Sequence, residues 1–237
     1  MALLAISGQD AIFQSIRSNL VAVPCYTKNV MKNEKEKIIE LENTIFSIRK
    51  KDLHAASFMA DLIGVIIDVK PAMLGAIYDC ELKNTSDIAT LKQALNELGL
   101  QMLPVHGNKL YDNFTNIYIA KNLRTAKKLS HAFEKLWSSM DHSGKVLSQR
   151  KWQKYHKKIG LMLGYPKTAV LDFIVETNIE DEKRMARMAR NRYYAHSERF
   201  EDEEYMAYDL KINHAIAELA PKTAKVFSSN KEKRWLD

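Results

Sequence analysis

The segment from Trp152 to Ile174 (WQKYHKKIGLMLGYPKTAVLDFI) constrains the fold most, because it has the pattern of a helix, an abrupt stop and a second helix. Gly164 can take the left-handed conformation that ends a helix, and Pro166 supplies a fixed φ that suits the start of the next one. We therefore expect a helical hairpin on a shared core, with Gly164, Tyr165 and Pro166 as its structural turn. The apolar stripe of the first helix is Trp152, Tyr155, Ile159, Met162 and Leu163.

Three short apolar runs in the middle of the chain predict a small sheet. They span about 72–78 (AMLGAIY), 100–105 and 114–120 (FTNIYIA). Pro104 cannot donate a ladder hydrogen bond, so the second run should be an edge strand. The short link between the second and third runs predicts that these two pair as an antiparallel hairpin.

Helical patterns surround these strands. Apolar residues recur at three and four positions from Glu34 to Ile67, with a break expected near Lys50–Asp52. Further helices are expected over 9–23, from a Thr85 or Ser86 cap to Leu98, and from Leu123 to about Met140. Beyond Asn178 the chain has a charged helical pattern, and its tail from 228 to 237 is expected to be frayed or disordered.

These elements together predict the fold class. The expected fold is α+β and predominantly helical, with the three-stranded sheet covered by helices and followed by a C-terminal helical region. We see no interdomain linker and no internal repeat, so we expect one domain over 1–237. The run at 179–227 could form a helical subdomain within it.

The positive charge of the chain is concentrated in one segment. The formal net charge is +7, yet between Lys121 and Lys167 twelve Lys and Arg residues face only Glu134 and Asp141. A local positive field favours an anionic ligand or polyanion, although it also suits a solvated helix face. Within this segment one helical face should carry Arg150, Lys151, Lys154, Lys157 and Lys158, which we predict to be a nucleic-acid or anion site.

Other classes of protein are made less probable by what the sequence lacks. Cys25 and Cys80 have no Cys-x-x-Cys spacing, which argues against a disulfide framework or zinc ribbon and favours a reducing cytoplasm. No apolar run is long enough to span a bilayer, and the N-terminus lacks the basic start of a secretory signal. We find no nucleotide-binding loop and no hydrolase or metalloprotease motif, so we expect no cofactor, no metal and no membrane partner.

Two histidines are candidates for chemistry. His156 lies at the edge of the apolar stripe, where a packing role is the commoner outcome. The segment Arg190–His196 (RNRYYAH) resembles the Arg-x4-6-His signature of HEPN-type ribonucleases. That resemblance implies metal-independent RNA cleavage in a dimer, with His196 as acid and base and Arg190 stabilising the phosphorane. In the family a small residue often follows the histidine, whereas in this chain Ser197 and Glu198 follow it.

A second resemblance involves the helical hairpin itself. The pattern His156-x-x-Ile-Gly-x-x-Leu-Gly-Tyr-Pro166, together with Val69–Ala72 and Leu98–Leu100, is similar to a group of uncharacterised bacterial proteins. The resemblance covers roughly 50–175. It implies a helical start, a small sheet and a late helical hairpin, and it carries no activity and no site residues.

The sequence therefore leaves two functional hypotheses. The first is a non-enzymatic binding protein whose basic surface contacts nucleic acid or another anionic partner. The alternative is a HEPN-like endoribonuclease that uses Arg190 and His196. The oligomeric state and the ligand do not follow from the sequence.

Overall fold

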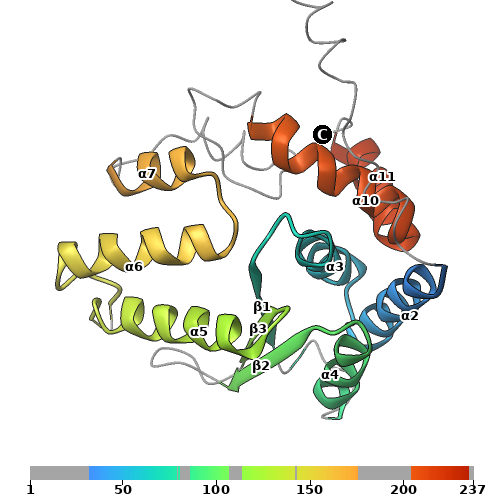
Figure 1. The fold of residues 1–237 in the computed structure, drawn as a ribbon, viewed down its shortest axis with the longest axis horizontal. Helices are drawn as coiled ribbons and strands as arrows, with labels where there is room; N and C mark the ends of the chain where they lie inside the picture. Colours follow the sequence, from blue (N-terminus) through green and yellow to red (C-terminus); the bar gives the residue numbers. More distant parts are fainter. Residues whose placement is uncertain are drawn as a thin grey trace, which may run out of the picture.

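The protein is described here by a computed structural model that covers residues 32–78, 80, 86–106, 114–141, 143–175 and 204–234. It is α+β and predominantly helical, as predicted, with one three-stranded sheet among helices (Figure 1). In chain order the elements are α2 (Lys32–Ile48), α3 (Asp52–Ile66), β1 (Ala72–Tyr78), α4 (Asp87–Glu97), β2 (Gln101–His106), β3 (Phe114–Ala120), α5 (Leu123–Trp137), α6 (Gln149–Met162), α7 (Lys167–Val175), the π-helix η3 (Tyr205–Asp209), α10 (Leu210–Leu219) and α11 (Pro221–Arg234).

The sheet has the strand order β1-β3-β2 and is antiparallel throughout. The predicted hairpin between the second and third strands is confirmed, with Gln101 opposite Ala120 and His106 opposite Thr115. Pro104 lies opposite Ile117 in the edge strand β2, where its missing N–H is tolerated. The sequence therefore predicted the strands and this pairing correctly.

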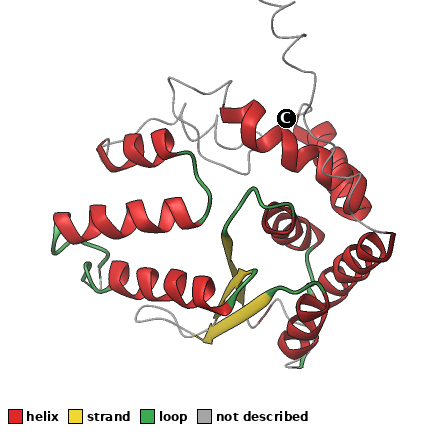
Figure 2. Ribbon diagram, in the orientation of Figure 1, coloured by secondary structure: helices red, strands yellow, loops and turns green. Residues whose placement is uncertain are grey.

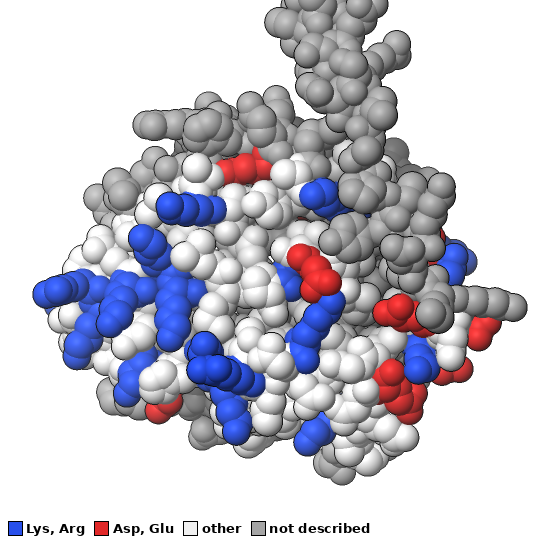
Figure 3. All heavy atoms as spheres, viewed as in Figure 1, with Lys and Arg blue, Asp and Glu red and all other residues white. Residues whose placement is uncertain are grey.

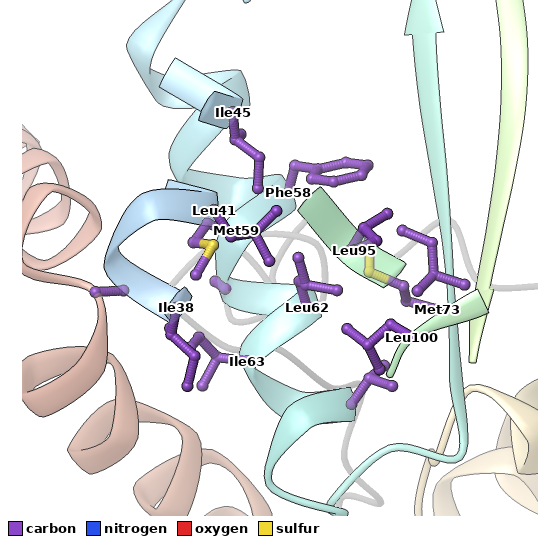
Figure 4. Packing of buried hydrophobic residues seen from close by; sticks show 14 of the residues in the cluster. Ile38, Leu41, Ile45, Phe58, Met59, Leu62, Ile63, Met73, Leu95 and Leu100 are labelled. Carbon is purple, nitrogen blue, oxygen red and sulfur yellow. The ribbon is translucent and has the colours of Figure 1, made fainter. Parts of the chain in front are cut away.

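The sheet separates two apolar cores, because alternate side chains of β3 point to opposite faces. Ile117 and Ile119 pack in the larger core with α2, α3, α4 and α10. Figure 4 shows residues of that core from α2, α3, β1 and α4. Tyr118 and Ala120 pack in the smaller core, mainly with α5 and α6. The helices α5, α6 and α7 accordingly form a layer on the other side of the strands from α3 and α4 (Figure 2).

The turn of the predicted hairpin is confirmed in detail. Gly164 has a φ of 81°. The N–H of Tyr165 donates to the Gly160 carbonyl at 2.9 Å, and the N–H of Gly164 donates to the Leu161 carbonyl at 3.2 Å. These two bonds define a Schellman motif at the end of α6. The Pro166 carbonyl then accepts the first helical hydrogen bond of α7, from Val170, at 3.0 Å.

Gly164 also lies against another part of the chain. A Cβ at this position would lie 3.1 Å from both the Lys70 Cα and the Val69 carbonyl oxygen, in the segment that leads into β1. Both neighbours are backbone atoms, so they cannot move aside as a flexible side chain would. Glycine is therefore required at position 164 for two reasons. Its φ is positive, and there is no room for a Cβ atom beside the backbone of Val69 and Lys70.

We predict that Gly164→Ala destabilises the protein by more than about 1–2 kcal/mol, the cost of a left-handed φ alone. The matched control is Gly144→Ala, because Gly144 has a φ of 82° and open space around its Cβ position. Urea denaturation of both variants measures the difference. Equal losses of stability would show that the contact with Val69 and Lys70 is unimportant.

The N-terminus of α11 is capped by a residue far away in the sequence. The Glu42 carboxylate, from α2, is fully buried and accepts hydrogen bonds from the backbone N–H groups of Thr223 (2.8 Å) and Lys222 (3.2 Å). Pro221, the first residue of α11, has no N–H to satisfy. The position before it is Ala220, which has no side-chain acceptor, so Glu42 supplies the missing cap.

Glu42→Ala should therefore cost about 1–3 kcal/mol of unfolding free energy, because it leaves two buried N–H groups without acceptors. The control is Glu40→Ala, which removes an exposed carboxylate from the same helix. Thermal or urea unfolding compares the two variants with the parent chain. Equal stability of the Glu42 variant and the control would contradict the proposed cap.

Some sequence predictions differ from the structure. The break between α2 and α3 occurs where expected, but Ser86 does not cap α4 with its side chain, because its backbone is helical and only its carbonyl accepts bonds. The helix that was expected to reach Met140 ends at Trp137. Residues 228–234 are assigned to α11, and 235–237 lie outside the described residues, so the frayed tail stays a prediction. The helix expected over 9–23 and the charged region 179–203 lie outside the described residues.

Candidate nucleic-acid interface

The helix α5 is anchored by small and apolar residues on one side. Its N-cap is Asn122, whose side chain accepts a hydrogen bond from the Thr125 N–H at 2.8 Å. Ala126, Leu129, Ala132 and Leu136 are buried against the sheet. The opposite side of the helix is exposed and carries Arg124, Lys127 and Lys128, which we call the α5 row.

The helix α6 has the same two-sided character. Ile159 is buried in the smaller core, and Trp152, Tyr155 and Met162 pack against it. All five cations that the sequence singled out are exposed. We call these five residues the α6 row: Arg150, Lys151, Lys154, Lys157 and Lys158.

The α5 row and the C-terminal end of the α6 row border a groove between α5 and α6. The groove has a volume of about 530 Å³, and Lys158 is the α6 side chain that lines it. Its other lining residues come from α5 and are Leu123, Arg124, Lys127, Lys128 and His131. From the sequence, the α5 cations belonged to the basic segment but were not assigned to the site. The sequence pattern that could have identified them is a spacing of three, four and seven residues from Arg124. This spacing places Lys127, Lys128 and His131 near the same helix face as Arg124.

Few negative charges offset this surface. Within the part of the chain that the structure describes, no residue of either row forms an ion pair, whereas the neighbouring Lys121 is paired with Asp68 at 2.6 Å. Glu134 lies 3.4 Å from the Nδ1 of His131. Figure 3 shows the result as a patch of Lys and Arg on the left of the view, over α5 and α6. We call the two rows together the basic face.

His156 is a packing residue in this structure. Its ring lies 3.9 Å from the ring of Trp152 and 5.4 Å from that of Phe173, measured between centroids. Its Nδ1 is 3.1 Å from the Trp152 carbonyl oxygen. Burial lowers the pKa of His156 below its ordinary value of 6.5, and the bond to the carbonyl partly offsets this effect. The imidazole is thereby held neutral between α6 and α7.

This pKa predicts a pH dependence of stability. The folded protein holds His156 neutral, while the unfolded chain takes up a proton near the ordinary pKa, so stability is lost as the pH falls below that value. His156→Gln should reduce the difference in unfolding midpoint between neutral and mildly acidic pH. The control variant is His214→Gln, which removes an exposed imidazole from α10. An unchanged difference in the His156 variant would contradict the prediction.

Tyr165 belongs to a polar cluster behind the hairpin turn. Burial raises the pKa of its hydroxyl, and the negative charges of Asp61 and Asp209 raise it further. Asp61 is paired with Lys70, whose side chain is buried and would clash with any Cβ at Gly64. These contacts join α3, the start of β1, the hairpin turn and η3, so we assign Tyr165 a structural role, as we do Gly164 and Pro166.

Several predicted features stay untested. Arg190 and His196 both lie outside the described residues, so their proximity is unknown. Within the described ranges, no group of three or more His, Cys, Asp or Glu residues could hold a metal ion. Each helix in these ranges is too short or too polar to cross a bilayer.

Comparison with known proteins adds no functional information. No family model, no curated protein and no solved structure matches this chain. The similarity to a group of uncharacterised bacterial proteins therefore stays a prediction, and functional inference has to start from the surface itself.

Proposed function

We propose that this protein is a non-enzymatic binding protein that contacts nucleic acid through its basic face. The observation that supports this most directly is a groove lined by cations from two helices. Lys158 from α6 lines the groove together with Arg124, Lys127 and Lys128 from α5. A concave surface with cations on both sides concentrates positive potential, and phosphate groups are the ligands that such a potential attracts.

The absence of internal ion pairs supports the same proposal. A lysine that already pairs with a carboxylate must break that pair to bind a phosphate, as Lys121 would have to break its contact with Asp68. Among the described residues this cost does not apply to the rows, since none of their members forms an ion pair there. No described carboxylate therefore competes with an external anion for these charges.

The chemistry of the groove favours backbone recognition over base recognition. Five of its six lining side chains are Arg, Lys or His, and the sixth is Leu123. Contacts of Lys and Arg to phosphates position a protein on nucleic acid without reading its sequence. We therefore expect binding that does not depend on sequence and that weakens steeply with salt.

The test is a titration of fluorescently labelled duplex DNA at several salt concentrations. With three to five phosphate contacts, the logarithm of the binding constant should fall against the logarithm of salt with a slope of about −3 to −5. Lys154→Glu/Lys158→Glu should reduce the magnitude of this slope by about 2, because each substituted lysine would otherwise neutralise one phosphate.

The matched control is Lys211→Glu/Lys225→Glu, which makes the same change in net charge at exposed positions of α10 and α11. It should bind nearly as well as the parent chain. The proposal is wrong if the parent chain does not bind nucleic acid at low salt. It is equally wrong if the two double variants lose the same affinity, because net charge alone would then explain binding.

A further inference from the structure

We infer that the groove between α5 and α6 binds single-stranded nucleic acid, with one base stacked on the ring of His131 and the adjoining phosphates held by the surrounding cations. This inference rests on the proposed function and adds the class of nucleic acid. It follows from the composition of the groove, which contains an exposed ring and an exposed apolar side chain as well as cations.

The ring of His131 is open to solvent within the groove. Its side chain is 57% exposed, and the Glu134 carboxylate lies 3.4 Å from its Nδ1. Among the described residues, no aromatic ring stacks on it. The nearby Tyr155 is half-buried and already has the Nζ of Lys154 at 5.7 Å from its ring centroid. His131 is therefore the ring that the groove offers to an unpaired base, and histidine is among the side chains on which bases stack.

Cations adjoin this ring on its own helix and on the next one. Lys127 and Lys128 precede His131 by four and three residues, and side chains at these spacings are neighbours on a helix surface, with Cβ atoms about 5–6 Å apart. Lys158 lines the groove from α6. Each nucleotide carries a base and a phosphate together, so a single strand presents both groups to this combination. Proteins that bind single strands commonly combine a positively charged groove with rings on which bases stack.

The size and lining of the groove suit a base as well as a phosphate. Its volume of about 530 Å³ lies within the range of pockets that hold small organic ligands, about 300–1,000 Å³. Leu123, at the N-terminal end of α5, lines the groove and is 39% exposed. An apolar side chain has no attraction for a phosphate, but it can contact the face of a base or the carbon atoms of a sugar.

A duplex cannot use the ring in the same way. Its bases are paired and stacked on one another, so a base must leave the stack before it reaches a side chain in a groove, at a cost in free energy. A duplex would therefore contact the cations through its backbone alone. We expect a single strand to bind more tightly than a duplex of the same length, even though the duplex carries more charge.

The experiment compares three DNA probes of equal length, each labelled at one end. They are a single strand, a strand of abasic residues that keeps the phosphates, and a duplex. Fluorescence anisotropy measures the affinity of the full chain for each probe at one low salt concentration. The single strand should bind about 5- to 150-fold more tightly than the abasic strand, which is the effect of one base stacked on an aromatic side chain.

Substitutions of His131 test whether its ring causes this preference. His131→Lys keeps a positive charge but removes the ring, so it should abolish the preference for the single strand over the abasic strand. His131→Phe keeps a ring without its nitrogen atoms and should retain the preference. The control His214→Ala removes an exposed imidazole from α10 and should bind all three probes as the parent chain does. Thermal unfolding checks the fold of each variant, and His131→Gln replaces His131→Lys should that variant not fold.

The possible outcomes separate this inference from the proposed function. Binding to no probe overturns both. Equal affinity for the single strand and the abasic strand overturns the inference alone, as does tighter binding of the duplex than of the single strand. A preference that His131→Lys retains, or that His131→Phe loses, also overturns it. In each of these cases the cations bind phosphates without a stacked base, and the proposed function stands.

Discussion

The structure depends on a small sheet whose central strand, β3, is buried on both of its faces. Ile117 and Ile119 pack into the larger core on one side, while Tyr118 and Ala120 pack into the smaller core on the other. The edge strand β1 contributes in the same way, with Met73 and Ile77 in the larger core and Ala72 in the smaller one. The two helical layers of the described chain are thus held together by alternate residues of the sheet, with β3 at its centre.

The exposure of the basic face follows from this arrangement. The helix α5 packs against the sheet through Ala126, Leu129 and Ala132, so its cations lie on the opposite, solvent-exposed side. The helix α6 is fixed in turn by Ile159. Small residues at the α5 contact let the helix approach the strands closely. The charges on the outside of this layer form no ion pair with a described residue, and our proposal assigns them to binding a ligand.

Features encoded by neighbouring residues were predictable from the sequence. The turn at Gly164 needs only a glycine at the right distance from the last apolar residue of a helix, and the same signal ends α4 at Gly99. The strands and the edge position of Pro104 followed from short apolar runs and one missing donor. The fold class could therefore be predicted from local patterns in the sequence.

Features that join distant segments were not predictable. Nothing near Arg124 indicates that Lys158 will share a groove with it, because that depends on how α5 and α6 pack. The cap of α11 by Glu42 and the pairing of Asp61 with Lys70 have no local signal either. Half of the candidate site was predicted, namely the α6 row, and the α5 row needed the tertiary structure.

The contact between Glu42 and Thr223 also bears on how the chain is made. Domains tend to fold as units while the chain leaves the ribosome, from the N-terminal end onward. Here the carboxylate of α2 finds its partners only after 181 further residues, and Ile212 and Ile216 fill the same core as the early helices. The strands exist well before that core is closed. Until α10 and α11 emerge, the nascent chain carries an open apolar surface and a carboxylate in need of solvent. The larger core can therefore be completed only after α10 has been synthesised.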